Sequence, residues 1–83
     1  MKILYFAWVK QKIGCSEETL VLPEHIKNTG ALLDWLAERH PQISEDFRHR
    51  EIVRVAKNQE YCDWNEPITD HDEIAIFPPV TGG

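Results

Sequence analysis

The sequence has little of what marks several large classes of protein. Only two cysteines occur among its 83 residues, which is too few for a disulfide-stabilised scaffold. These two, Cys15 and Cys62, are also too far apart for a CxxC pair, so ordinary reduced thiols are expected, as in most cytosolic proteins. The apolar runs are far shorter than the roughly 20 residues that cross a bilayer. A membrane span is therefore not expected.

Positive charge is scarce as well. Nine Lys and Arg stand against fourteen Asp and Glu, giving a formal net charge of -5 with no basic stripe. Nucleic-acid binding depends on neutralising phosphates, so this composition argues against it and favours partners with basic surfaces. The N-terminus shows no apolar signal segment, and the expected location is cytoplasmic. A chain of this length forms one domain without room for an enclosed substrate cavity.

The apolar pattern predicts an element order of β-β-α-β-(β)-β. Residues 2–10 form a continuous apolar run that predicts one long strand, and residues 17–22 alternate as a second strand does. A helix is predicted from about Gly30 to His40, with Thr29 as its N-cap. Gly30 is a weak helix former there, at a cost of up to about 1 kcal/mol.

The second half of the chain completes a small sheet. It is predicted to contain a helical turn at 43–47, a strand at 51–57, a turn at 58–60, a short edge strand at 61–62, a polar loop at 63–72 and a strand at 73–77. The first and last strands are the most apolar and are expected side by side in the middle. The fold class is α+β, a β-grasp (ubiquitin-like) mixed sheet of four to five strands with one main helix on one face.

One helix leaves the other sheet face uncovered. The lysines at both ends of the alternating set place Lys2, Leu4, Phe6, Trp8 and Lys10 outward, and Phe77 of the last strand outward with them. An exposed patch of Phe6, Trp8 and Phe77 is typical of a docking surface. The alternative is that loops or residues 43–47 cover this face, in which case polar substitutions at Phe6 or Trp8 have no effect on association.

The last six residues form a distinct motif, so the domain is predicted to span residues 1–77 and a tail residues 78–83. Pro78 and Pro79 end the sheet pairing and favour an extended arm of roughly 20 Å. Gly82 and Gly83 carry no side chain, so the terminal carboxylate could enter a narrow channel of another protein.

The ending from Phe77 to Gly83 resembles that of the small subunit of molybdopterin synthase, the MoaD family. Similar stretches occur along the whole chain, at residues 2–7, 40–41, 55–58 and 70–73. His71 stands where that family commonly has Gly, so a positive φ is expected there. This resemblance implies the same β-grasp fold and a chemistry located at the C-terminus.

The resemblance also implies a reaction cycle. A separate adenylating enzyme would use ATP to join AMP to the carboxylate of Gly83, and sulfur would then replace the AMP to give a thiocarboxylate. The product would deliver sulfur to cyclic pyranopterin monophosphate in a heterotetramer with the large synthase subunit. Gly82 and Gly83 would be the reacting end, while Phe6, Trp8, Phe77, Pro78, Pro79, Val80 and Thr81 would contact partners. No cofactor would be bound by this chain.

Other sites and functions compete with this one. The histidines at 25, 40, 49 and 71 have no metal-ligand spacing, neither cysteine has a neighbouring base, and the acidic residues at 70, 72 and 73 indicate a solvated turn. The competing functions are a sulfur carrier for another pathway such as thiamine synthesis, a modifier that conjugates Gly83 to lysines, and a non-catalytic adaptor.

Overall fold

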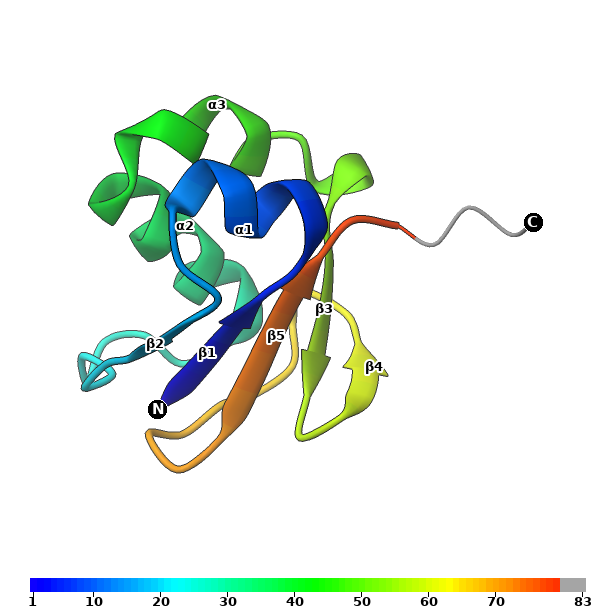
Figure 1. The fold of residues 1–83 in the computed structure, drawn as a ribbon. Helices are drawn as coiled ribbons and strands as arrows, with labels where there is room; N and C mark the ends of the chain where they lie inside the picture. The colour runs from blue at the N-terminus through cyan, green and yellow to red at the C-terminus, as the bar shows by residue number, and fades with distance from the viewer. Residues whose placement is uncertain (80–83) are drawn as a thin grey trace.

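The computed structural model describes residues 1–79, and within them a mixed five-stranded sheet packs against a group of helices (Figure 1). The strand order is β2-β1-β5-β3-β4. In chain order the elements are β1 (Lys2–Tyr5), α1 (Ala7–Ile13), β2 (Glu17–Thr19), α2 (Thr29–Arg39), η1 (Pro41–Ile43), α3 (Ser44–Phe47), η2 (Arg50–Ile52), β3 (Arg54–Lys57), β4 (Glu60–Cys62) and β5 (Glu73–Phe77), where η marks a 3-10 turn.

The centre of the sheet is the pair formed by β1 and β5. These strands run parallel, with Lys2 opposite Glu73 and Tyr5 opposite Ile76, and β3 joins the other side of β5 antiparallel. The bounds of β5 agree with the predicted last strand. The predicted β-grasp architecture is confirmed, including the adjacent positions of the first and last strands.

The first predicted strand was too long. It ends at Tyr5, and residues 7–13 form helix α1, which buries Val9 and Ile13 one turn apart against the core. The chain turns at Ala7, whose φ of 54° lies in the left-handed region. A continuous apolar run fits a buried strand and a buried helix equally well, so its pattern did not separate the two.

Helix α2 lies where it was predicted, but its cap is a different residue. Asn28 is the N-cap, and its Oδ1 accepts a hydrogen bond of 2.8 Å from the amide of Ala31. Thr29 is buried instead, and its hydroxyl donates to the carbonyl of Asp63 at 2.7 Å. Both residue types are good caps, and only the tertiary contact of Thr29 decides between them.

Gly30 is required by a close backbone approach. Its amide donates to the carbonyl oxygen of Trp64 at 2.8 Å. A Cβ at this position would lie 2.8 Å from that oxygen and 3.0 Å from Nη1 of Arg50. The helix-propensity cost predicted for Gly30 is therefore offset by packing that a side chain would prevent.

The remaining elements differ from prediction in their extent. The strands predicted at 17–22 and 51–57 are shortened to β2 and β3. The 3-10 turn η2 occupies the start of the second predicted range, before β3 begins. The predicted turn at 43–47 is confirmed as α3, preceded by η1, and its Ile43 and Phe47 pack into the core rather than over the far face of the sheet. The core is formed by side chains from one sheet face and all three helices, among them Ile3, Tyr5, Val9, Leu32, Leu33, Leu36, Val55, Ile74 and Ile76.

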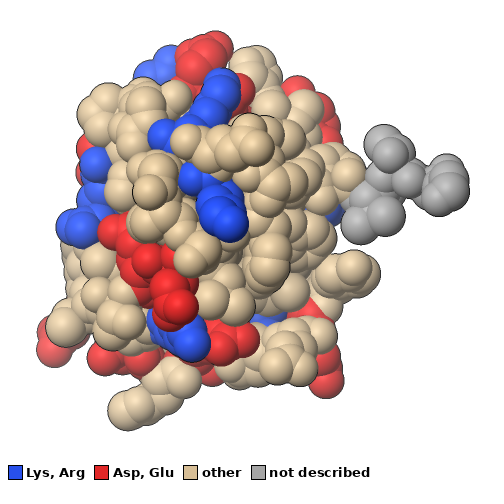
Figure 2. All heavy atoms as spheres, in the orientation of Figure 1, with Lys and Arg blue, Asp and Glu red and all other residues tan. Residues whose placement is uncertain are grey.

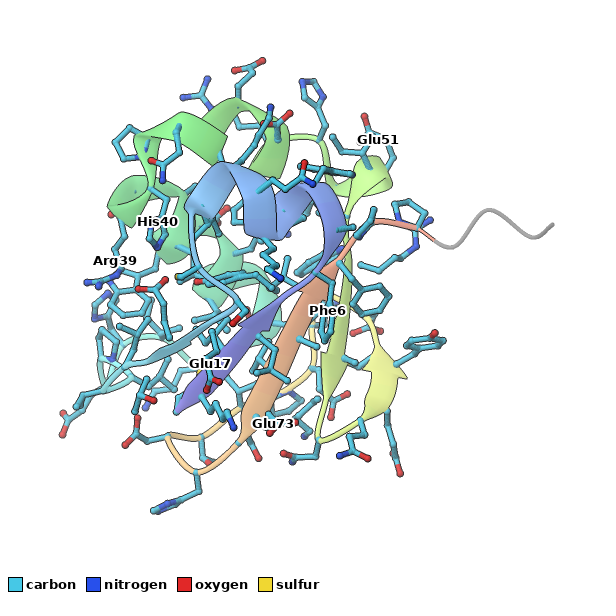
Figure 3. The ribbon with its side chains drawn as sticks, viewed as in Figure 1. Phe6, Glu17, Arg39, His40, Glu51 and Glu73 are labelled. Atoms are coloured by element: carbon cyan, nitrogen blue, oxygen red, sulfur yellow. The ribbon has the colours of Figure 1, made fainter. Side chains whose placement is uncertain are left out.

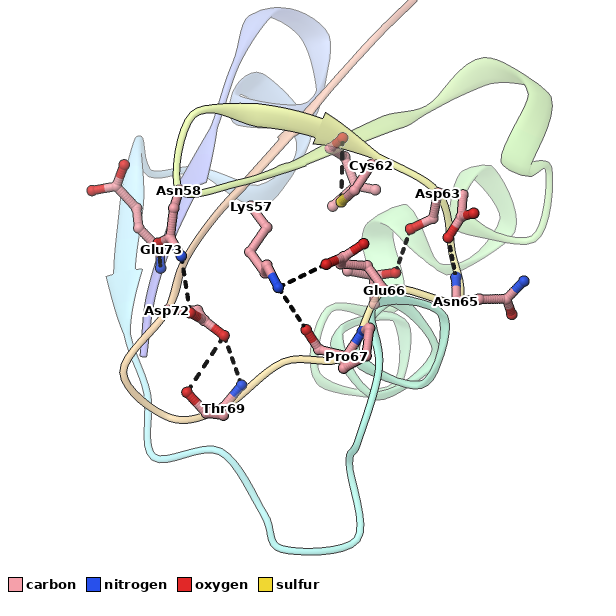
Figure 4. Close-up of polar contacts among 12 residues, drawn as sticks. Lys57, Asn58, Cys62, Asp63, Asn65, Glu66, Pro67, Thr69, Asp72 and Glu73 are labelled. Carbon is pink, nitrogen blue, oxygen red and sulfur yellow. Dashed lines mark hydrogen bonds and ion pairs between the residues drawn. The ribbon is translucent and has the colours of Figure 1, made fainter.

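The predicted polar loop at 63–72 is tied to the β3–β4 hairpin (Figure 4). Lys57 Nζ lies 2.7 Å from Glu66 Oε2 and donates to the carbonyl of Pro67 at 3.0 Å. Asp72 accepts from Asn58 Nδ2 at 2.9 Å and from the amide of Thr69 at 2.7 Å. Hydrogen bonds from the hairpin and from the loop thus occupy the Asp72 carboxylate.

The positive φ expected at His71 was wrong, since the positive-φ residues in this half of the described chain are Asn58 and Gln59 in the hairpin turn. No helix in residues 1–79 combines the length and the apolar composition needed to cross a bilayer.

Candidate docking face and the tail exit

The face of the sheet opposite the helices is partly exposed. Along β5, Ile74 and Ile76 are buried, whereas Glu73, Ala75 and Phe77 are half-buried and point to the other side. This is the orientation predicted for the last strand. In the space-filling view of Figure 2 the right half of this face is mostly uncharged, whereas acidic side chains gather at the lower left and along the bottom.

Three aromatic residues mark one end of this face, and we call Phe6, Tyr61 and Phe77 the aromatic face. The rings of Tyr61 and Phe77 lie 5.5 Å apart between centroids, and Tyr61 is 79% exposed. Phe6 is 48% exposed, and its amide donates to the carbonyl of Ile76 at 3.2 Å, which places its backbone beside the end of β5 (Figure 3). Exposed aromatic clusters of this kind are typical anchors of protein interfaces.

Trp8 is not placed as predicted. It lies on α1 rather than on a strand, so it does not alternate with Phe6 across the sheet, and it packs partly buried against the core with Lys12 Nζ 5.9 Å from its ring centroid. Its role as a partner contact stays a prediction.

Tyr61 was missed as a site residue, although it was expected on an edge strand. The two-residue turn of the β3–β4 hairpin sets Tyr61 opposite Ala56, which in turn faces Ala75. Counting from the turn would have placed Tyr61 opposite Ala56, but only the pairing of β3 with β5 places it on the same side of the sheet as Phe77.

A shallow pocket of about 370 Å³ opens beside the aromatic face, lined by Arg54, Val55, Tyr61, Cys62 and Phe77. Burial raises the pKa of the Cys62 thiol, with the carboxylates of Glu66 and Asp63 adding to the effect. A raised pKa keeps the thiol protonated and weakly reactive. The pocket therefore offers a binding surface rather than a nucleophile.

The tail leaves the sheet next to this pocket. Phe77 is both the last residue of β5 and part of the pocket wall, and the half-buried Pro78 and Pro79 follow it directly. The predicted sites at Val80, Thr81, Gly82 and Gly83 lie outside the described residues and stay predictions. The division into a domain of residues 1–77 and a tail of residues 78–83 likewise stays a prediction.

A cluster of hydrogen-bonded polar side chains lies on the far side of the molecule from the tail. Tyr5 Oη donates to Glu18 Oε1 at 2.7 Å, and His40 Nε2 lies 2.7 Å from the same oxygen (Figure 3). Burial would raise the pKa of Glu18, but the hydrogen bonds to Tyr5 and His40 and the charge of Arg39 hold it below its usual value. These contacts join β1, β2 and the end of α2, which is a structural role.

Residues 1–79 contain no group of three or more His, Cys, Asp or Glu side chains that could hold a metal ion. The candidate site in the described chain consists of the aromatic face, the pocket beside it and the start of the tail. A family model matches nearly the whole chain, from residue 3 to residue 83, and its description is the ThiS family. The chain belongs to the ThiS family.

Several curated relatives of this ThiS-family chain are molybdopterin synthase sulfur carrier subunits. The chain is 42% identical to the one from Dictyostelium discoideum, over 99% of this chain and 94% of the relative. The molybdopterin synthase sulfur carrier subunits of Homo sapiens and Escherichia coli are 35% and 32% identical to it. Those matches include all of this chain and 93% and 99% of the respective relatives. The resemblance found in the sequence is confirmed over the full length.

Solved structures of similar proteins have the same fold. A putative molybdopterin converting factor subunit 1 from Pyrococcus furiosus is 32% identical, with a TM-score of 0.77 over 95% of both chains. SAMP1 from Haloferax volcanii is 26% identical, with a TM-score of 0.78 over 99% of this chain and 97% of that one. The family match includes residues 80–83, so the tail belongs to the shared sequence.

Proposed function

We propose that this ThiS-family chain is the sulfur carrier subunit of a molybdopterin synthase, with Gly83 as the sulfur-bearing residue. The observation that carries the proposal is the full-length similarity to proteins of that description from an amoeba, a mammal and a bacterium. The uncovered aromatic face and the tail that begins beside it supply the two parts that a carrier needs.

The carrier chemistry takes place at a backbone carboxylate. A carboxylate is inert toward nucleophiles until a good leaving group replaces one oxygen. An adenylating enzyme would use ATP to form an acyl-adenylate on Gly83 with release of pyrophosphate. A persulfide sulfur would then attack the acyl carbon and expel AMP, and a thiol would reduce the resulting acyl disulfide to the thiocarboxylate.

Delivery of the sulfur requires a second protein. In the proposed complex the aromatic face docks on the large synthase subunit and the tail reaches into that subunit's active site. There two thiocarboxylates, one from each of two carriers, supply the sulfur that converts cyclic pyranopterin monophosphate to molybdopterin. This stoichiometry corresponds to a heterotetramer of two small and two large subunits.

The carrier needs no catalytic side chain of its own. A thiocarboxylate is ionised at neutral pH and is already a nucleophile, so no base has to activate it. Acid-base groups and the ATP site belong to the partners in this proposal. The raised pKa of Cys62 and its half-buried position agree with a thiol that takes no part.

A second candidate function follows from one structural comparison. A second Haloferax volcanii structure, of small archaeal modifier protein 1, is 25% identical to this chain with a TM-score of 0.79. A modifier would use the same activation of Gly83, but a lysine amine rather than sulfur would displace AMP.

A carrier for a different sulfur pathway, such as thiamine synthesis, would form the same thiocarboxylate and differ only in its acceptor.

The test is to move the carboxylate. Addition of one residue after Gly83, or deletion of Gly83, is expected to abolish sulfur delivery because the reacting carbon no longer reaches its position in either partner. The thermal melt of each variant serves as the control and is expected to match that of the parent chain. Full activity in the extended variant would contradict the proposal.

A further inference from the structure

Arg54 stands at the meeting point of the pocket, the aromatic face and the tail. It is the first residue of β3 and pairs across the sheet with Phe77, the last residue before the tail. Its side chain is exposed and forms part of the pocket wall with Tyr61 and Phe77. A partner that contacts Phe77 in this pocket would therefore also lie close to Arg54.

The guanidinium of Arg54 is fixed on one side by the backbone. Its Nη1 donates to the carbonyl oxygens of Arg50, Glu51 and Val53 at 3.4, 3.3 and 3.0 Å, at the end of the η2 turn. These three contacts hold the group in place before any partner arrives. Ordering a long side chain in advance removes part of the entropic cost of using it in binding.

The other side of the guanidinium is left for a ligand. Within residues 1–79, Nε and Nη2 of Arg54 donate no hydrogen bond, and no carboxylate lies within 4 Å. Every other arginine lies near a carboxylate: Arg39 at 3.9 Å from Glu18, Arg48 at 3.5 Å from Glu45 and Arg50 at 3.0 Å from Asp34. The Nε and Nη2 edge is the one that binds a carboxylate through two parallel hydrogen bonds.

We propose that Arg54 is a specificity-determining residue of the docking face, and that its pocket receives a carboxylate side chain of the large synthase subunit, flanked by the rings of Tyr61 and Phe77. The inference rests on the proposed function, since it names a contact within that complex. A chain of net charge -5 repels acidic groups over most of its surface. One fixed cation beside the tail admits a single acidic group and so sets the register of the two proteins.

The experiment measures the affinity of the full-length chain for the large subunit of the same organism, by calorimetry at low and at high salt. Arg54→Gln is expected to raise Kd about tenfold at low salt and to flatten the salt dependence, because a charge pair is lost. Arg48→Gln is the matched control, because it removes the same charge from an exposed site outside the pocket. It is expected to change Kd by less than about twofold.

Arg54→Lys tests geometry separately from charge. Lysine keeps the charge but has no two-pronged edge, so an increase in Kd of about threefold or more is expected. It also retains a donor for the η2 carbonyls and therefore provides the test if Arg54→Gln melts below the assay temperature. The inference is overturned if Arg54→Lys leaves Kd unchanged and Arg54→Gln leaves the salt dependence unchanged. If Arg54→Gln is unfolded, an unchanged Kd in Arg54→Lys alone overturns it.

Phe77→Ser separates this inference from the proposal on which it rests. If Phe77→Ser weakens binding and the Arg54 variants do not, the docking face stands and Arg54 has no role in it. If neither affects binding, the docking face itself is wrong. If both weaken binding and Arg48→Gln does not, the assignment of Arg54 is supported.

Discussion

The ring of Tyr61 packs against the ring of Phe77 at a tilt of 35°, on the side of the sheet that the helices leave uncovered. Tyr61 lies on the edge strand β4 and Phe77 is the last residue before the tail, so the pair links the sheet surface to the point where the tail begins. Docking through this pair would orient the tail toward the partner, and the first prediction tests that link.

Tyr61→Ser is predicted to weaken binding to the large subunit about tenfold or more, as truncation of an aromatic anchor does. Tyr61 is 79% exposed, so the free energy of unfolding is expected to change by less than about 0.5 kcal/mol. Val21→Ser is the matched control, because Val21 is an 82% exposed apolar residue outside the aromatic face. Equal affinities for the two variants would remove Tyr61 from the interface.

Gly30→Ala is predicted to destabilise the domain by about 2 kcal/mol, although alanine is the better helix former by about 1 kcal/mol. The added Cβ would lie 2.8 Å from the carbonyl oxygen of Trp64, and a backbone atom cannot rotate away. Urea denaturation measures the change. Glu38→Ala, at an exposed position of the same helix, is expected to stay within about 0.5 kcal/mol. A more stable Gly30→Ala variant would show that the approach to Trp64 is not close.

Ala7→Gly is predicted to stabilise the domain by about 0.5 to 1 kcal/mol. Ala7 is exposed and has a φ of 54°. At this φ a Cβ comes too close to the neighbouring backbone, and glycine avoids the clash because it has no Cβ. Ala7→Val adds branching at the same carbon and is expected to destabilise by about 1 to 2 kcal/mol. Thermal melts of both variants provide the check, and an order of stability with valine above glycine would contradict the conformation of this junction.

Glu18→Gln is predicted to destabilise the domain at neutral pH by about 1 to 2 kcal/mol, because the carboxylate accepts hydrogen bonds from Tyr5 and His40. The pKa of Glu18 is held below its usual value in the folded state. The stabilisation is therefore complete above the unfolded pKa of about 4.3 and is lost as the pH falls through the lower, folded pKa. Urea titrations at neutral pH and near pH 3 test this, and a gap that stays constant between them would exclude the carboxylate as the cause.

The sequence predicted those parts of the fold that depend on local patterns. Alternation with period two located β5, and its apolar character placed it beside β1. The start of α1 was missed because Ile3 to Val9 is apolar throughout, so that nothing in the run marks Phe6 and Ala7 as a junction. The need for Gly30 was also missed, since it depends on Trp64, more than thirty positions away in the chain.

The candidate site was predicted in part for similar reasons. Phe6 and Phe77 were expected on an uncovered face and both are at least partly exposed there. Trp8 was grouped with them because the alternation of a strand was assumed to continue through it, but β1 ends at Tyr5. Tyr61 and Arg54 join the site only through the pairing of β3 with β4 and β5, which sequence patterns do not specify.

The most direct test of the central claim is the intact mass of the chain after incubation with ATP, the adenylating enzyme and a persulfide donor. The account predicts an increase equal to the replacement of one oxygen atom by sulfur, located in the C-terminal peptide and lost after addition of the large subunit and cyclic pyranopterin monophosphate. Covalent adducts with lysines of other proteins, or a mass that does not change while the adenylating enzyme is active on a known carrier, would contradict it.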